Sequence, residues 1–147
     1  MNVNLIKLQM VKENIGTYDG RRNISAPQTV YDFLRDYTDM AESPEEQFYM
    51  LALNTKNQIV GVHLVSQGSL NSSVVHPREV FKRAMLNNAC SIIVAHNHPS
   101  GNPAPSQTDI DVTRRLAEGG ELLGIALLDH IITGDGNYIS LKEKMLI

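Results

Sequence analysis

The spacing of hydrophobic and polar positions changes along this chain, and each spacing predicts a different kind of element. Residues 5–12 alternate, with Ile6, Leu8 and Met10 on one face, which indicates a half-buried edge strand or an ordered arm. From about residue 27 to residue 39 the apolar positions recur at helical intervals behind a helix-start signal. The chain is therefore expected to begin with an extended segment that leads into a helix.

The middle of the chain is predicted to contain three strands and one helix. Two apolar runs, 48–53 and 59–65, flank a polar turn and predict a hairpin of two central strands. A helix is expected to begin at Pro77, because proline suits the first helical turn, and to carry an apolar face as far as Ala89. The short apolar run 91–95 then predicts a buried strand.

The last third of the chain is again predicted to alternate between helices and strands. A helix is expected from Ser106 to the glycine pair 119–120, because glycine suits the left-handed residue that ends many helices. Apolar runs at 125–133 and 138–139 predict a second hairpin, and a capping box starting at Ser140 predicts a short final helix. The order of elements indicates an α/β fold in which helices cover a sheet.

Size and composition narrow the class of protein. With 147 residues, 42% of them hydrophobic, the chain is expected to form one domain over 27–147, with 1–26 as an N-terminal arm or edge strand. An edge strand there could pair between copies of the chain. The formal charge of −3 argues against a general nucleic-acid binder.

The apolar runs, the N-terminal residues and the cysteine content indicate the cellular compartment and the redox chemistry to expect. No apolar run approaches the length of a membrane span, and the first residues do not resemble a signal peptide, so a cytoplasmic location is expected. Cys90 is the single cysteine, and its position before an apolar run predicts a buried, inert thiol.

A cluster of metal-binding residue types follows the strand at 91–95. His96 and His98 alternate with one residue between them, and Ser106 and Asp109 come shortly afterwards. Two residues apart in an extended chain, the imidazoles project from one face and can bind the same ion. Two imidazoles and one carboxylate leave a fourth position of Zn²⁺ open for water, which is typical of catalytic zinc.

Other interpretations of the same residues stay open. Ser106 and Asp109 also match a helix-capping box, in which case they serve the helix rather than a metal. Two histidines and a carboxylate also form the facial triad of non-haem iron oxygenases. A zinc hydrolase further needs a proton acceptor. The acidic residues upstream that could supply this base are Glu42, Glu45, Glu46 and Glu79.

The spacing His96, His98, Ser106 and Asp109 resembles the JAMM motif of the MPN-type metalloprotease superfamily. Within it the chain is similar to the RadC family over about residues 45–147. Four segments carry this second similarity: Asn71-Ser72-Ser73, His76-Pro77-Arg78-Glu79-Val80, Ala95 to Gly101, and Leu128-Asp129-His130. The resemblance implies a three-layer-like, cytidine-deaminase-like JAMM/MPN fold with a mixed central sheet flanked by helices.

The resemblance also implies roles for individual residues. It suggests His96, His98 and Asp109 as zinc ligands and Ser106 as a donor to the developing oxyanion. The family's Glu-x-Phe pattern selects Glu46 as general acid/base, with Glu45 as the alternative. His130, inside an apolar strand, could orient a ligand. The segment 71–73 and His76 are explained equally well by turn or helix capping.

The implied activity is hydrolysis of a peptide or isopeptide carbonyl by zinc-bound water. Two other functions stay open: a RadC-type DNA-repair factor acting on or near DNA, and a metal-binding interaction module without turnover. Full-length RadC proteins carry an added N-terminal helix-hairpin-helix region that residues 1–26 do not resemble, which counts against the DNA function.

Overall fold

The computed structural model describes residues 1–17, 24, 26–68 and 75–147. Its elements follow the predicted order of helices and strands. They are α1 (Pro27–Tyr37), β1 (Gln47–Leu53), β2 (Ile59–Gln67), α2 (Pro77–Leu86), β3 (Ser91–Asn97), α3 (Gln107–Leu123), β4 (Ala126–Thr133) and β5 (Tyr138–Ser140). The predicted α/β class is confirmed, and most predicted boundaries differ from the observed ones by one to three residues.

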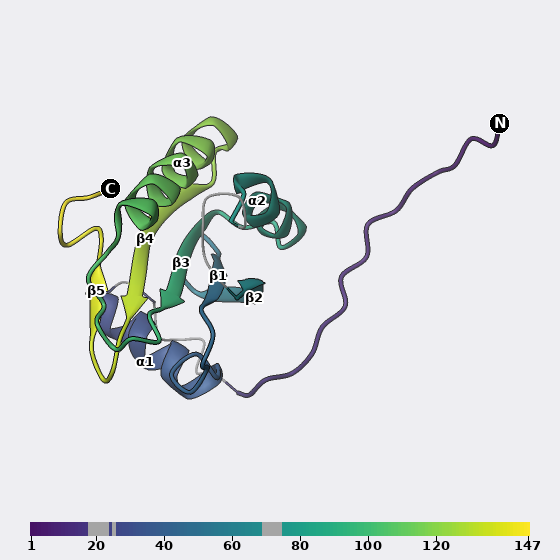
Figure 1. Cartoon of the computed structure of the whole chain (residues 1–147). Helices are drawn as coiled ribbons and strands as arrows, with labels where there is room; N and C mark the ends of the chain where they lie inside the picture. Colours follow the sequence, from purple (N-terminus) through teal and green to yellow (C-terminus); the bar gives the residue numbers. More distant parts are fainter. Residues whose placement is uncertain (18–23, 25, 69–74) are drawn as a thin grey trace.

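The five strands form one mixed sheet in the order β2-β1-β3-β4-β5. β1 pairs antiparallel with both β2 and β3, whereas β3 and β4 run parallel and are joined through α3. α1 lies on one side of the sheet, and α2 and α3 lie on the other (Figure 1). The sheet is therefore the middle layer of three.

Strand alternation divides the core into two halves. Even-numbered residues of β1 and β3, such as Met50 and Val94, pack with α2 and α3. Odd-numbered residues, such as Leu51 and Ile93, pack with α1. In β1 and β3, even-numbered residues therefore face α2 and α3, and odd-numbered residues face α1.

Two predicted helix boundaries were wrong for identifiable reasons. α3 continues through Gly119 and Gly120 and ends at Leu123, and Gly124, with a φ of 72°, is its left-handed cap. A Cβ at Gly120 would lie 2.3 Å from the Ile125 carbonyl, so this glycine permits close packing inside the helix. The expected final helix forms only a turn after Ser140, because Met145 adopts a φ of 57°.

Two further expectations from the sequence can be compared with the structure. Of the two alternatives for residues 5–12, an edge strand or an arm, the structure has the extended arm (Figure 1). Ile6 and Leu8 remain exposed on it, whereas Met10 contacts Asn87 and is only 36% exposed. Cys90 is exposed rather than buried, because it precedes the first residue of β3. Among the described residues, no helix has the length and apolar character needed to cross a membrane.

Candidate metal centre

Three elements bring His96, His98 and Asp109 together at one end of the sheet. β3 places His96 near its carboxyl end, the next turn carries His98, and the first turn of α3 carries Asp109. The two Nε2 atoms lie 3.0 Å apart, and each lies 3.2 Å from one carboxylate oxygen of Asp109. The expected ligand set is thus assembled from residues that the sequence separates by up to thirteen positions.

Asp109 serves the helix and the cluster at the same time. Ser106 is the N-cap of α3, and its Oγ accepts the Asp109 amide at 3.1 Å. The Asp109 carboxylate in turn accepts the Ser106 amide at 2.8 Å, which completes a capping box. The capping box is present and is compatible with the metal interpretation, because the capping bond orients the carboxylate toward the histidines.

His96 is supported from inside the core by His130 and Thr113. The Thr113 hydroxyl donates to the Asp109 carbonyl at 2.6 Å, so it must accept from Nδ1 of His130, which lies 2.6 Å away. His130 Nε2 is then left as an acceptor for the Nδ1–H of His96, at 2.8 Å. This chain of bonds assigns the tautomer of His96 that leaves its Nε2 unprotonated.

His98 is supported from a surface loop. Its Nδ1 donates to the carbonyl of Asn102 at 2.8 Å, and its own amide donates to the Thr133 carbonyl at 2.8 Å. Because a carbonyl only accepts, Nδ1 carries the proton and Nε2 of neutral His98 is also unprotonated. Both imidazoles therefore present lone pairs to the same point.

This donor set fits a metal ion. Two imidazole lone pairs and a carboxylate converge, and lone pairs repel unless a cation lies between them. Tetrahedral Zn²⁺ with bonds of about 2.0–2.1 Å would place its ligand atoms about 3.3 Å apart. The separations of 3.0 to 3.2 Å between Nε2 of His96, Nε2 of His98 and the Asp109 oxygens are close to that value.

The electrostatics of the metal-free cluster agree with its role as a cation site. Burial alone would raise the pKa of Asp109. Without a metal, His96 and His98 can also take a proton on Nε2 and donate it to this carboxylate, and that hydrogen bonding outweighs burial and holds the pKa of Asp109 well below its usual range. The hydrogen bond to Asp109 raises the pKa of His98. Burial, together with the nearby charge of His96, lowers the pKa of His130 far below its usual value, so His130 stays neutral.

Glu46 is the upstream carboxylate whose charge acts on the cluster. It is two residues before Phe48, whose ring lies near His96 and His130 on the α3 side of the sheet. By alternation Glu46 projects to that same side, and its charge contributes to the raised pKa of His98. Glu45 is offset by one residue and is exposed, so the geometry favours Glu46.

Of the other predicted residues, Glu79 and His76 have structural roles. Glu79 forms ion pairs with Lys82 and Arg83, and Glu42 lies exposed after α1. His76 is the N-cap of α2, where its Nδ1 accepts the Arg78 amide. Residues 71–73 lie outside the described part of the chain. Among the described residues, no contact brings Glu42, His76 or Glu79 to the cluster of His96, His98 and Asp109.

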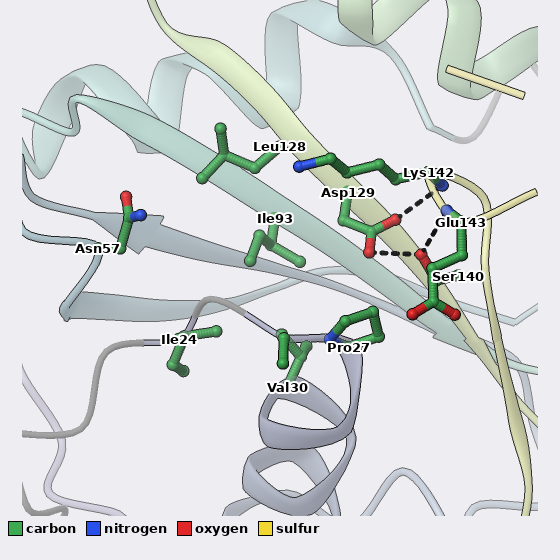
Figure 2. A pocket seen from close by; sticks show the side chains of 11 residues that line it. Ile24, Pro27, Val30, Asn57, Ile93, Leu128, Asp129, Ser140, Lys142 and Glu143 are labelled. Carbon is green, nitrogen blue, oxygen red and sulfur yellow. Dashed lines mark hydrogen bonds between the residues drawn. The ribbon is translucent and has the colours of Figure 1, made fainter. Parts of the chain in front are cut away.

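Asp129 belongs to the opposite side of the sheet from its neighbour His130. Its carboxylate accepts the Ser140 hydroxyl at 2.7 Å and the Lys142 amide at 3.1 Å, as Figure 2 shows. It lines a cavity of about 390 Å³ that is also bordered by Val30 of α1. Asp129 therefore fastens β4 to the C-terminal turn, while His130 supports the metal cluster.

Thr113, Asn97 and Asn102 were missed by the sequence analysis. A signal existed for Thr113, since it lies four residues after Asp109 and so on the same helix face. Asn102 acts through its backbone carbonyl, which carries no residue-specific signal. Asn97 lies between the two histidines, and its side chain is directed away from them.

Comparison with known proteins places this site in a family. A family profile described as RadC-like JAB domain matches residues 24–146, which is most of the chain. The chain belongs to the RadC-like JAB-domain family. The match begins upstream of the segments on which the resemblance was based and includes α1.

Relatives in this family are longer than the present chain. A UPF0758 protein of Methanosarcina mazei is 56% identical over 124 residues, which is 84% of this chain and 53% of that protein. A UPF0758 protein of Desulfitobacterium hafniense is 48% identical over 136 residues, or 87% of this chain and 60% of that protein. The chain thus spans somewhat more than half the length of these relatives.

Proposed function

We propose that this RadC-like JAB domain is a zinc-dependent hydrolase of the metallopeptidase or isopeptidase type. The observation that carries the proposal is the convergence of two unprotonated Nε2 atoms and the Asp109 carboxylate, with Glu46 beside them. A structural zinc site uses four protein ligands, whereas three here leave a coordination position for chemistry. Zinc is preferred to iron for the two-histidine, one-carboxylate set on the basis of the JAMM spacing.

The protein's own groups divide the work. A bound zinc ion would supply a Lewis acid and a water of lowered pKa. Glu46 would take the proton from the attacking water and pass it to the leaving amine, a role that needs a carboxylate near the ligands but not among them. Ser106 accepts from the Asp109 amide, so its hydroxyl proton is free to donate to a developing oxyanion.

The proposed binding partners follow from this reaction class. A peptide or isopeptide is the substrate that the reaction class favours. A DNA-associated role and a metal-binding module without turnover are the competing outcomes of the experiment. Association between copies of the chain and a cytoplasmic location likewise stay predictions.

The test combines metal analysis with activity. Purified protein is expected to hold about one zinc per chain and to cleave members of a peptide and isopeptide panel, with a DNA panel assayed in parallel. Glu46→Gln should retain zinc and lose turnover by about 10²- to 10⁴-fold. Glu45→Gln is the matched control and should behave as wild type.

Three results would count against the proposal. Iron or no bound metal would contradict the zinc assignment. Full activity of zinc-loaded Glu46→Gln would remove Glu46 from the mechanism. Cleavage of DNA but no peptide would favour the DNA-associated function, and zinc binding without any cleavage would favour the interaction module.

A further inference from the structure

Asn97 connects the strand that carries the metal ligands to the segment that carries Glu46. Its side chain is 4% exposed and contacts the backbone on both sides of that glutamate. Oδ1 accepts the amide of Gln47 at 2.6 Å, and Nδ2 donates to the carbonyl of Glu45 at 3.0 Å. The two bonds use both halves of the side-chain amide, much as a peptide group does in a sheet.

The position of these bonds is explained by the sheet register. Phe48 pairs with His96 in the last described step of the β1–β3 ladder, so Gln47 and Asn97 come next on their strands. The Asn97 side chain takes over the pairing at that point. On the other edge of β1, the Gly68 amide donates to the Glu46 carbonyl at 2.8 Å. The backbone from Glu45 to Gln47 is therefore held from both neighbouring strands.

Alternation makes Asn97 suitable for this task. His96 projects toward α3, and Asn97, one residue later, projects to the α1 side, as Gln47 of β1 also does. Glu46 projects to the α3 side with His96. A contact on one side of the sheet thereby fixes a carboxylate on the other side without occupying the space where substrate would bind.

We propose that Asn97 is a positioning residue that sets Glu46 relative to the metal ligands. We call its two backbone hydrogen bonds the Asn97 clamp. The role of Glu46 as base rests on the proposed hydrolase function, but the clamp itself does not. Because Asn97 is covalently flanked by His96 and His98, a shift of the ligands would carry the base segment with it.

The test compares Asn97→Ser, which removes both bonds, with Asn54→Ser. Asn54 is a matched control at the opposite end of β1, where its Oδ1 accepts the amides of Lys56 and Gln58. In Asn97→Ser, hydrogen exchange of the Gln47 amide should become about three- to tenfold faster, the loss expected for one net hydrogen bond. In Asn54→Ser, the Gln58 amide should accelerate instead. Asn97→Asp keeps the acceptor and should restore protection of Gln47.

Metal affinity and turnover then separate positioning from general damage. Zinc affinity of Asn97→Ser, measured by chelator competition, should stay within about threefold of wild type, since no bond of the ligand set is removed. kcat should fall by about 10- to 100-fold with little change in KM, as expected for a misplaced catalytic group. In a Glu46→Gln background, Asn97→Ser should cause no further loss.

Several results would overturn the proposal. Unchanged exchange of the Gln47 amide in Asn97→Ser would show that the clamp does not exist. Equal losses of kcat in Asn97→Ser and Asn54→Ser, or additive losses with Glu46→Gln, would reduce Asn97 to a structural residue. A wild type that cleaves no substrate would count against the proposed function alone, because exchange and zinc affinity still decide on the clamp.

Discussion

His96 and His98 are two residues apart and of the same type, yet the fold supports them in different ways. His96 is 1% exposed and is held by side chains of the core, namely His130 and then Thr113. His98 has a side chain that is 15% exposed and is held by the backbone carbonyl of a surface loop. One histidine is therefore fixed by specific buried residues and the other by the path of a loop.

This difference identifies substitutions that can disturb the site without replacing His96 or His98 themselves. Support through side chains can be removed by changing one of them. Support through a backbone carbonyl can be disturbed only by moving the loop. Metal-ligating histidines are typically sensitive to the partner of their second nitrogen, so both kinds of change should be visible in metal affinity.

The largest effect is expected from removing the partner of His96. His130→Leu leaves the Nδ1–H of His96 buried without an acceptor and frees its tautomer. Zinc affinity should fall by about 10- to 100-fold. His130→Gln, whose Oε1 can accept from His96, should recover part of the loss. Equal zinc affinity of wild type and His130→Leu, measured by chelator competition on folded protein, would show that the buried support is dispensable.

A smaller effect is expected on the His98 side from Gly134→Ala. A Cβ at Gly134 would lie 2.3 Å from the Gly101 carbonyl, so the loop that follows His98 must move. Zinc affinity should fall by up to about tenfold, since the ligand stays but its orientation loosens. Gly136→Ala in the same hairpin is the control, because its Cβ meets nothing within 4 Å, although its φ of 70° adds some strain. Comparable affinities for the two variants would contradict loop support.

The same comparison explains what sequence could predict. Local spacing, which can be read directly from the sequence, predicts the order of elements. It also predicts the His96-x-His98 pair and Asp109 as candidate ligands. The side of the sheet to which Glu46 projects follows from alternation once β1 is placed. The partners of the histidines could not be predicted, because His130 meets His96 only through the parallel pairing of β3 with β4.

Errors in the prediction have the same origin. Gly119 and Gly120 have the residue type of a helix end, but both lie inside α3, where Gly119 packs closely against Phe81 and Gly120 packs closely against the backbone at Ile125 and Leu127. Residues 5–12 have the pattern of a strand, yet no neighbouring strand pairs with them among the described residues. A local pattern indicates which secondary structure a segment can form, and its contacts with neighbouring segments determine whether that structure forms.

Thr113→Val should produce a milder version of the His130 effect. The substitution preserves shape but removes the hydroxyl that accepts from His130 Nδ1, so His130 can reverse its tautomer and oppose the Nδ1–H of His96. Zinc affinity should drop several-fold, and unfolding free energy should fall by about 1–3 kcal/mol for the unpaired buried donor. Thr113→Ser retains the hydroxyl and should keep the affinity. If Ser and Val behave alike in chelator competition, the hydroxyl does not set the tautomer.

The smallest expected effect is on the pH dependence of the unfolding free energy of the metal-free protein. His98 and His130 should change this free energy in opposite directions as the pH rises. The pKa of His98 is raised, so its contribution to stability is complete below about pH 6.5 and is lost as pH rises through the raised value. The pKa of His130 is lowered, so its contribution is complete above about pH 6.5 and is lost as the pH falls.

Urea midpoints measured without metal should therefore decline on both sides of a maximum near pH 6.5. In His98→Gln the alkaline decline should disappear while the acid decline persists, because burial, the largest cause of the lowered pKa of His130, is unchanged. A loss of both declines in His98→Gln would mean that the two histidines titrate as one unit, and the contrast between core support and loop support would then fail for the metal-free protein.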